Sequence, residues 1–149
     1  MQSDEKMSNH FTIEELTFSQ TAVRKGIDNS IPRDLIANLY LLVDGLEQVR
    51  SLLDAPMSIS SGYRSPKLNA SIGGAKTSQH MQALAADFTC PQFGTPLEIV
   101  KEIAASEIEY DQVIQEGTWV HISFATNNPR KQVLTANFTN GKATYTQGV

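Results

Sequence analysis

The chain has 149 residues, of which 40% are hydrophobic and 19% charged, and its formal net charge is -4 at pH 7. A chain of this length can build one conventional hydrophobic core, so the composition predicts a single domain. The 16 acidic residues outnumber the 12 basic ones, which argues against duplex nucleic acid or anionic lipid as the main partner. The single cysteine, Cys90, excludes a disulfide framework, cysteine-pair zinc fingers and CxxC redox motifs.

The N-terminal residues are polar, and they lack the basic and apolar regions of a secretory signal. We therefore expect synthesis in the cytoplasm without a signal peptide. Residues 1–9 have the composition of a flexible leader, and residues 10–149 are expected to form the folded domain. No stretch of about 20 apolar residues is present, so we expect no integral membrane segment.

The first predicted helix follows a capping box. Thr12 and Glu15 have the spacing of that motif, and the helix is expected to end near Ser19. Residues 23–31 contain glycine, aspartate, asparagine and serine, which is typical of a connecting loop.

The strongest periodic signal follows Pro32, a residue that suits the first position of a helix. Apolar residues then recur at steps of three and four, which predicts a core helix of about six turns. These residues are Leu35, Leu39, Leu42, Val43, Leu46, Val49 and Leu53. Residues 54–56 should end the helix, and residues 57–61 alternate as a half-buried strand does.

Residues 62–79 are expected to form a long irregular stretch, and such loops often carry function. A strand is predicted at residues 84–88. A second capping box, formed by Thr95 and Glu98, predicts a helix that runs to about Glu107.

Two pairs of strands complete the chain. Residues 111–115 and 119–124 flank a turn at Gly117, while residues 133–138 and 143–146 flank the Asn140-Gly141 hairpin signal. Strands outnumber helices after residue 55, and short turns join them. This pattern predicts an α+β fold, in which helices pack on one side of an antiparallel sheet.

Candidate metal ligands lie on or beside these strands. His80, Asp87 and His121 would supply two imidazoles and a carboxylate, a set that can hold a catalytic zinc ion with one position open. Glu116 lies close enough to His121 to act as general base. The alternative for each histidine is a satisfied core residue. Asp87 lies in an apolar run, where an unpaired carboxylate is costly, so it indicates a cation or several donors nearby.

Three ordered segments resemble the motifs of the M15 family of zinc metallopeptidases, the D-alanyl-D-alanine carboxypeptidase-like group. The chain is most similar to the compact single-domain branch found in bacteria and their phages. The resemblance spans about residues 11 to 125 and leaves the final hairpin outside. The segments are Gly62-Tyr-Arg64-Ser65, Ser78-Gln-His80 with Ala85 and Asp87, and Trp119-Val-His121-Ile-Ser123.

The resemblance implies one zinc ion per chain, held by His80, Asp87 and His121. It also implies that Arg64 and Ser78 contact substrate and that an acidic residue shortly before the last histidine is the base. Trp119 should face the same side of its strand as the histidine two residues later, where it would form a wall of the cleft. The alternatives are a surface arginine, a turn serine and a core tryptophan.

Two positions depart from the family pattern. Relatives usually carry glycine where this chain has Ala83, and a methyl group there is tolerable unless the backbone needs a positive φ. Many relatives also place the acidic residue three positions before the last histidine, where this chain has Thr118. A turn at Gly117 would let Glu116 serve instead, and Asp111 is the fallback.

The resemblance implies a zinc-dependent peptidase acting on bacterial peptidoglycan stem peptides or cross-links. We expect a phage lysis endopeptidase, an endolysin, that is monomeric and reaches the cell wall or periplasm with a holin-like partner. The alternatives are a D-Ala-D-Ala carboxypeptidase, a host enzyme, and a catalytically silent zinc-containing wall-binding or virion protein. Cobalt or manganese could also enter such a site, with zinc the default.

Overall fold

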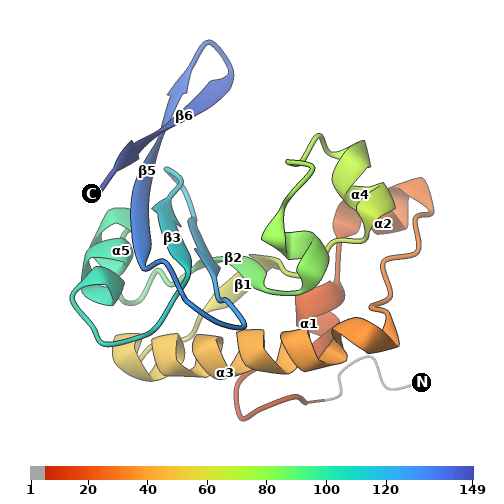
Figure 1. The fold of residues 1–149 in the computed structure, drawn as a ribbon, viewed down its shortest axis with the longest axis horizontal. Helices are drawn as coiled ribbons and strands as arrows, with labels where there is room; N and C mark the ends of the chain where they lie inside the picture. The colour runs from red at the N-terminus through yellow and green to blue at the C-terminus, as the bar shows by residue number, and fades with distance from the viewer. Residues whose placement is uncertain (1–5) are drawn as a thin grey trace.

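The computed structural model describes residues 6–149 and has an α+β fold, which confirms the predicted class. The helices and a single sheet form one body (Figure 1). The helices are α1 (Ile13–Thr17), α2 (Gln20–Lys25), α3 (Ile36–Leu53), α4 (Pro66–Ser71) and α5 (Pro96–Ala104), with 3-10 turns η1 (Arg33–Leu35) and η2 (Gln79–Gln82). In the described part of the chain, no helix is both long and apolar enough to cross a membrane.

The sheet has six strands in the order β1-β2-β4-β3-β5-β6. Neighbouring strands are antiparallel except β3 and β5, which are parallel, so the predicted antiparallel arrangement has this one exception. The strands are β1 (Ser58–Ser61), β2 (Ala85–Thr89), β3 (Gln112–Gln115), β4 (Val120–Ser123), β5 (Gln132–Thr139) and β6 (Lys142–Gln147). The β5–β6 hairpin extends beyond the rest of the sheet, and Asn140 and Gly141 at its tip both have positive φ, as the hairpin signal predicted (Figure 1).

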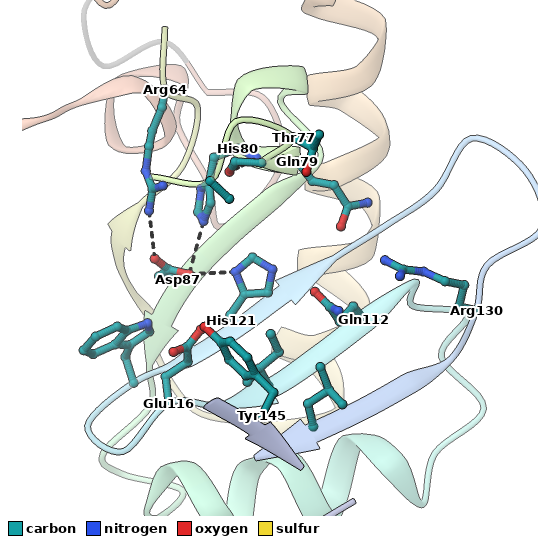
Figure 2. A pocket seen from close by; sticks show the side chains of 15 residues that line it. Arg64, Thr77, Gln79, His80, Asp87, Gln112, Glu116, His121, Arg130 and Tyr145 are labelled. Carbon is teal, nitrogen blue, oxygen red and sulfur yellow. Dashed lines mark hydrogen bonds and ion pairs between the residues drawn. The ribbon is translucent and has the colours of Figure 1, made fainter. Parts of the chain in front are cut away.

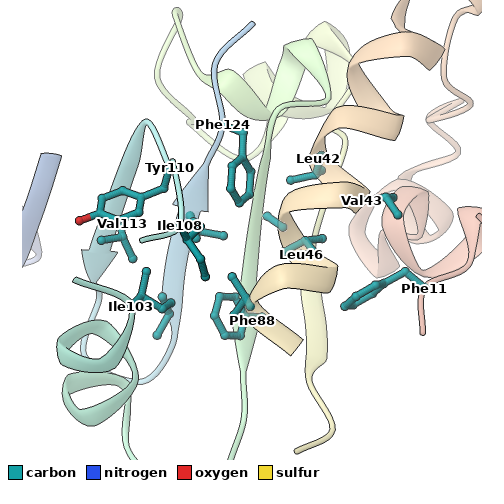
Figure 3. Close-up of a cluster of buried hydrophobic side chains, with 14 of the residues drawn as sticks. Phe11, Leu42, Val43, Leu46, Phe88, Ile103, Ile108, Tyr110, Val113 and Phe124 are labelled. Atoms are coloured by element: carbon teal, nitrogen blue, oxygen red, sulfur yellow. The ribbon is translucent and has the colours of Figure 1, made fainter. Parts of the chain in front are cut away.

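The core lies between α3, α5 and one face of the sheet (Figure 3). Every predicted apolar position of α3 from Leu39 onward is buried, and Leu35 in η1 packs against this core. Burying each of these side chains contributes about 1.5–3 kcal/mol before entropy is counted. Gly45 allows the ring of Phe124 to lie against α3, because a Cβ atom there would be 2.2 Å from the ring. This contact fixes the end of β4 on the helix.

Three local predictions were wrong. Part of the loop predicted at residues 23–31 belongs to α2, which Ser19 caps and which ends at Gly26 with φ 67°. The stretch predicted as irregular at residues 62–79 contains α4, where Ser65 caps and Pro66 is the first helical residue. Pro32 precedes η1 in an extended conformation and is not helical. Each error concerns a segment of only one or two turns, too short for a hydrophobic period.

Both predicted capping boxes, at the starts of α1 and α5, are confirmed. Residues ahead of α1 also contact the domain. Ser8 and His10 donate hydrogen bonds to the carboxylate of Glu47 on α3, and the side chain of His10 is 43% exposed. Residues 1–5 of the predicted leader lie outside the described residues, and the flexibility of the leader stays a prediction.

Candidate metal centre

Strand alternation sets the position of two candidate ligands. On β2 and β4 the residues that flank Asp87 and His121 are buried in the core under α3 and α5. Successive side chains of a strand point to opposite faces, so Asp87 and His121 lie on the other face. They are also directly opposed in the antiparallel register of the two strands. His80 reaches them from η2, the turn that precedes β2 (Figure 2).

The three candidate ligands converge. His80 Nε2 lies 3.3 Å and His121 Nδ1 lies 3.1 Å from the same oxygen, Oδ1 of Asp87. One donor atom from each residue lies within 4.8 Å of the others. His80 is 3% and Asp87 8% exposed, so these groups are largely removed from solvent.

The hydrogen bond of His80 to the backbone identifies its free nitrogen. Nδ1 lies 2.7 Å from the carbonyl oxygen of Gly62, which can only accept, so Nδ1 carries the proton. In the neutral ring, Nε2 then presents a lone pair to the carboxylate of Asp87. Two lone pairs at this distance repel unless a proton or a cation lies between them.

A zinc ion fits this arrangement. Tetrahedral zinc with bonds of about 2.0–2.2 Å holds its ligand atoms about 3.3 Å apart, close to the spacings around Asp87 Oδ1. The backbone bond of His80 fixes its ring in the way that supporting bonds orient metal-bound histidines. Burial alone would raise the pKa of Asp87, but a proton on the facing nitrogens of His121 and His80, in the place that a cation would take, holds that pKa well below its ordinary value. The carboxylate is therefore ionised, as a metal ligand must be.

Arg64 is fixed beside this cluster. Its backbone N–H donates to the carbonyl of His80 at 3.0 Å. Its guanidinium donates to Ser61 Oγ and Asn69 Oδ1, and one nitrogen lies 3.5 Å from Asp87 Oδ2. Burial lowers the pKa of Arg64, with opposing contributions from Asp87 and Glu116, yet an arginine stays charged in proteins. A fixed positive charge thus lies at the edge of the candidate metal site.

Ser78 has a structural contact in this region. It caps η2, and its Oγ accepts from the backbone N–H of His80 at 3.1 Å. Ser78 also lines the cavity above the candidate ligands, so its hydroxyl is close to the place that substrate would occupy.

The β3–β4 turn positions Glu116 at the same cavity. Gly117 has φ 86°, and the backbone N–H of Glu116 donates to the carbonyl of Trp119 at 3.0 Å, so Gly117 and Thr118 form a two-residue turn. The backbone N–H of Thr118 donates to the carbonyl of Glu116 at 3.1 Å, which with the positive φ forms a γ-turn centred on Gly117. Thr118 is exposed at the tip of that turn, whereas Glu116 lies at the cavity wall. The turn therefore places Glu116, the base that we predicted from the sequence, at the wall of the cavity.

The carboxylate of Glu116 forms no hydrogen bond with any residue from 6 to 149. Burial raises its pKa, the charges of His121 and Arg64 lower it, and the charge of Asp87 raises it again, with a net increase. Asp111, the fallback base, differs from Glu116 because its carboxylate is hydrogen-bonded. Its carboxylate accepts from Arg130 Nη2 at 2.7 Å and from Gln79 Nε2 at 3.1 Å, so its oxygens are already engaged.

Trp119 lines the cavity with a polar atom that has no partner. Its indole Nε1 is buried and forms no hydrogen bond within the described part of the chain. The residue as a whole is only partly buried, so part of its ring faces the cavity. This observation favours the cleft-wall interpretation of Trp119 over the core interpretation.

These groups share one cavity of about 470 Å³, a size in the usual range for small ligands. Figure 2 shows the lining side chains arranged around the candidate ligands. Among the lining residues that sequence reasoning missed, three come from the C-terminal segment, namely Arg130, Leu134 and Tyr145. No local sequence pattern indicates that this segment folds back beside β3.

Ala83, where the resemblance led us to expect glycine, has φ 60° and ψ 34° and is fully buried directly after η2. The left-handed conformation costs a non-glycine residue about 1–2 kcal/mol. Glycine would relieve this cost, but it would lose a buried methyl, about 0.8 kcal/mol, and gain unfolded-state entropy, about 0.4–1 kcal/mol. We therefore expect Ala83→Gly to change the free energy of unfolding by less than about 1 kcal/mol.

Ala83→Val should instead destabilise the protein by more than about 2 kcal/mol, because a branched side chain at positive φ is strained and this site is closely packed. Denaturant unfolding of both variants under one metal condition measures the difference. Equal stability of the two would contradict the assigned backbone conformation.

A comparison with protein families gives one match. The family model described as Peptidase M15 matches residues 9–123, which is most of the chain. The matched segment contains all three candidate ligands, Arg64 and Glu116, and it ends before the lining residues of the C-terminal segment. No curated protein matches the chain.

Proposed function

Because the chain belongs to the Peptidase M15 family, we propose that it is a zinc-dependent peptidase that hydrolyses stem peptides or cross-links of bacterial peptidoglycan. The observation that carries this proposal is the convergence of His80, Asp87 and His121 in a cavity that also holds Glu116 and Arg64. Family membership makes the protein a peptidase. The metal, the substrate and the roles of these residues are our inference.

His80 Nε2, Asp87 and His121 Nδ1 hold the zinc ion in this proposal. The chemistry that zinc supplies when bound is polarisation of the scissile carbonyl and easier deprotonation of a water molecule. The bond from His80 to Gly62 keeps the ring in the required tautomer. Asp87 contributes the negative charge that offsets part of the charge of the cation.

Glu116 is the general base. Its carboxylate faces the cavity without a hydrogen-bond partner among the described residues, so it is free to accept a proton from water. The protonated side chain then donates to the leaving amine, which completes peptide hydrolysis. Asp111 is a poorer candidate, because Arg130 and Gln79 already bind its oxygens.

Arg64 and Trp119 position the substrate. The guanidinium of Arg64 offers a fork of donors that suits a carboxylate or a carbonyl of a short peptide. The ring of Trp119 lines the same cavity and offers a surface against which a peptide can pack. Ser78 lines the same cavity and is the third proposed contact.

We favour cleavage within the stem or cross-link over removal of terminal D-alanine, because lysis of a host cell requires the wall to be opened. In this account the protein is a phage lysis enzyme that acts at the wall after a holin-like partner gives it access. The short peptides of peptidoglycan, with their free acid groups, match the chemistry of Arg64.

Digestion of purified peptidoglycan with mass spectrometry of the released fragments tests this function. We expect fragments cut inside the stem or cross-link, absent in the presence of a chelator and restored by zinc. Release of D-alanine alone would assign a carboxypeptidase instead. If several wall types release nothing although one zinc ion is bound per chain, the protein is a silent binding module and the proposal is wrong.

A further inference from the structure

The cavity has a wall that the family match does not cover. Arg130, Leu134 and Tyr145 all lie beyond residue 123, where the match ends, and all line the cavity that contains the candidate ligands. In Figure 2 the labelled side chains of Arg130 and Tyr145 approach from the side opposite Arg64 and His80. A substrate bound in this cavity would therefore contact residues of the C-terminal segment, which lies outside the family match.

Arg130 is held firmly, although its side chain is 54% exposed. Its backbone N–H and its Nε both donate to Asp111 Oδ1, and Nη2 donates to Asp111 Oδ2 at 2.7 Å. Asp111 is only 5% exposed. Because Asp111 also accepts from Gln79, a residue of η2, the pair is tied to the segment that carries His80.

The bonds to Asp111 leave part of the guanidinium free. They use Nε and Nη2, and no hydrogen bond within residues 6–149 involves Nη1. Asp111 offsets much of the positive charge of Arg130. The guanidinium therefore offers a ligand mainly the two N–H donors of Nη1, and the bonds to Asp111 fix the direction of these donors. Such donors suit a carboxylate oxygen, and the fork of an arginine binds carboxylates with defined geometry.

Arg130 and Arg64 lie on opposite sides of the candidate ligands (Figure 2). A peptide whose scissile bond sits over these ligands would extend towards both arginines. Two guanidinium groups with free N–H donors so placed are complementary to a substrate with an acid group on each side of the bond that is cut.

We propose that Arg130 is a specificity-determining residue that binds a second substrate carboxylate, across the scissile bond from the group bound by Arg64. This inference rests on the proposed function, and it narrows the substrate class to peptides that carry two free carboxylates. Peptides in which one carboxylate is replaced by an amide would be poor substrates.

The test uses four versions of one stem peptide: both carboxylates free, each one amidated, and both amidated. For the wild type we expect each amidation to lower kcat/KM. Arg130→Gln should lower kcat/KM about tenfold on the fully acidic peptide, mainly through KM, and should remove the effect of amidating one carboxylate. Arg64→Gln should remove the effect of the other. Arg33→Gln, at an exposed arginine of η1, is the matched control.

Arg130→Gln leaves the buried carboxylate of Asp111 short of donors, so the double variant Arg130→Gln, Asp111→Asn is measured beside it. The proposal is overturned if Arg130→Gln lowers kcat/KM by one common factor on all four peptides, or on none.

Binding of the same peptides to the zinc-loaded Glu116→Gln protein, measured by calorimetry, separates this inference from the proposed function. Affinity that depends on one carboxylate and on Arg130, without any cleavage by the wild type, would sustain the inference while the proposed function fails. Affinity that is the same for all four peptides would overturn the inference.

Discussion

Replacing Glu116 by glutamine will lower kcat for peptide hydrolysis by about 10²- to 10⁴-fold, the usual contribution of general acid–base catalysis. Glutamine has the same shape but cannot accept the proton from water or return it to the leaving amine. Zinc content should stay at one ion per chain, because Glu116 is not among the three converging ligands. Steady-state kinetics and metal analysis of one preparation measure both quantities.

Two further variants sharpen this experiment. Glu109→Gln changes an exposed acidic residue and should keep full activity. Adding Thr118→Glu to the Glu116→Gln protein moves the acid to the position three before His121 that the resemblance implied. Activity should not return, because Thr118 is exposed at the tip of the turn. Full turnover by Glu116→Gln would remove this residue from the mechanism, and rescue by Thr118→Glu would show that the turn lies differently.

Replacing Asp87 by alanine will abolish both zinc binding and turnover. Asp87 Oδ1 is the atom that both histidines approach, and Oδ2 lies beside Arg64. Without this carboxylate, two imidazoles and a nearby guanidinium remain, a set with no negative charge to offset a divalent cation. Loss of supporting contacts alone costs about 10- to 100-fold in metal affinity, so removal of a ligand should cost more than 100-fold.

Metal analysis after dialysis against a fixed free zinc concentration measures this effect. Asp44→Asn, at an exposed aspartate of α3, is the control and should bind zinc as the wild type does. Near-stoichiometric zinc in Asp87→Ala, at undiminished affinity, would mean that the metal sits elsewhere. Circular dichroism of the variant checks that it remains folded.

The long helix and the strands could be predicted because their signals are local. The apolar period of α3 follows from the side of the helix that faces the core, and short apolar runs indicated β2 and β4. Alternation also places Asp87 and His121 on one face once the two strands are neighbours. That neighbour relation is not local, and the resemblance to a known family supplied the ligand set before the structure showed the residues together.

The features that sequence reasoning missed depend on distant parts of the chain. The parallel pairing of β3 with β5 brings Leu134 beside the cavity, and no pattern near residue 134 encodes that neighbour. The bond between Arg130 and Asp111 spans 19 positions, so Asp111 read alone looked like an available carboxylate. The positive φ of Ala83 could not be predicted either, because an alanine, unlike a glycine, does not indicate a left-handed backbone conformation.

The central claim is that hydrolysis depends on one zinc ion held by His80, Asp87 and His121. Zinc titration of chelator-treated protein tests it most directly, with hydrolysis of a soluble stem peptide measured at each addition. The account predicts no turnover in the stripped protein and a linear recovery that ends at one zinc ion per chain, with no recovery in the Asp87→Ala variant. Turnover that persists after the metal is removed would contradict it.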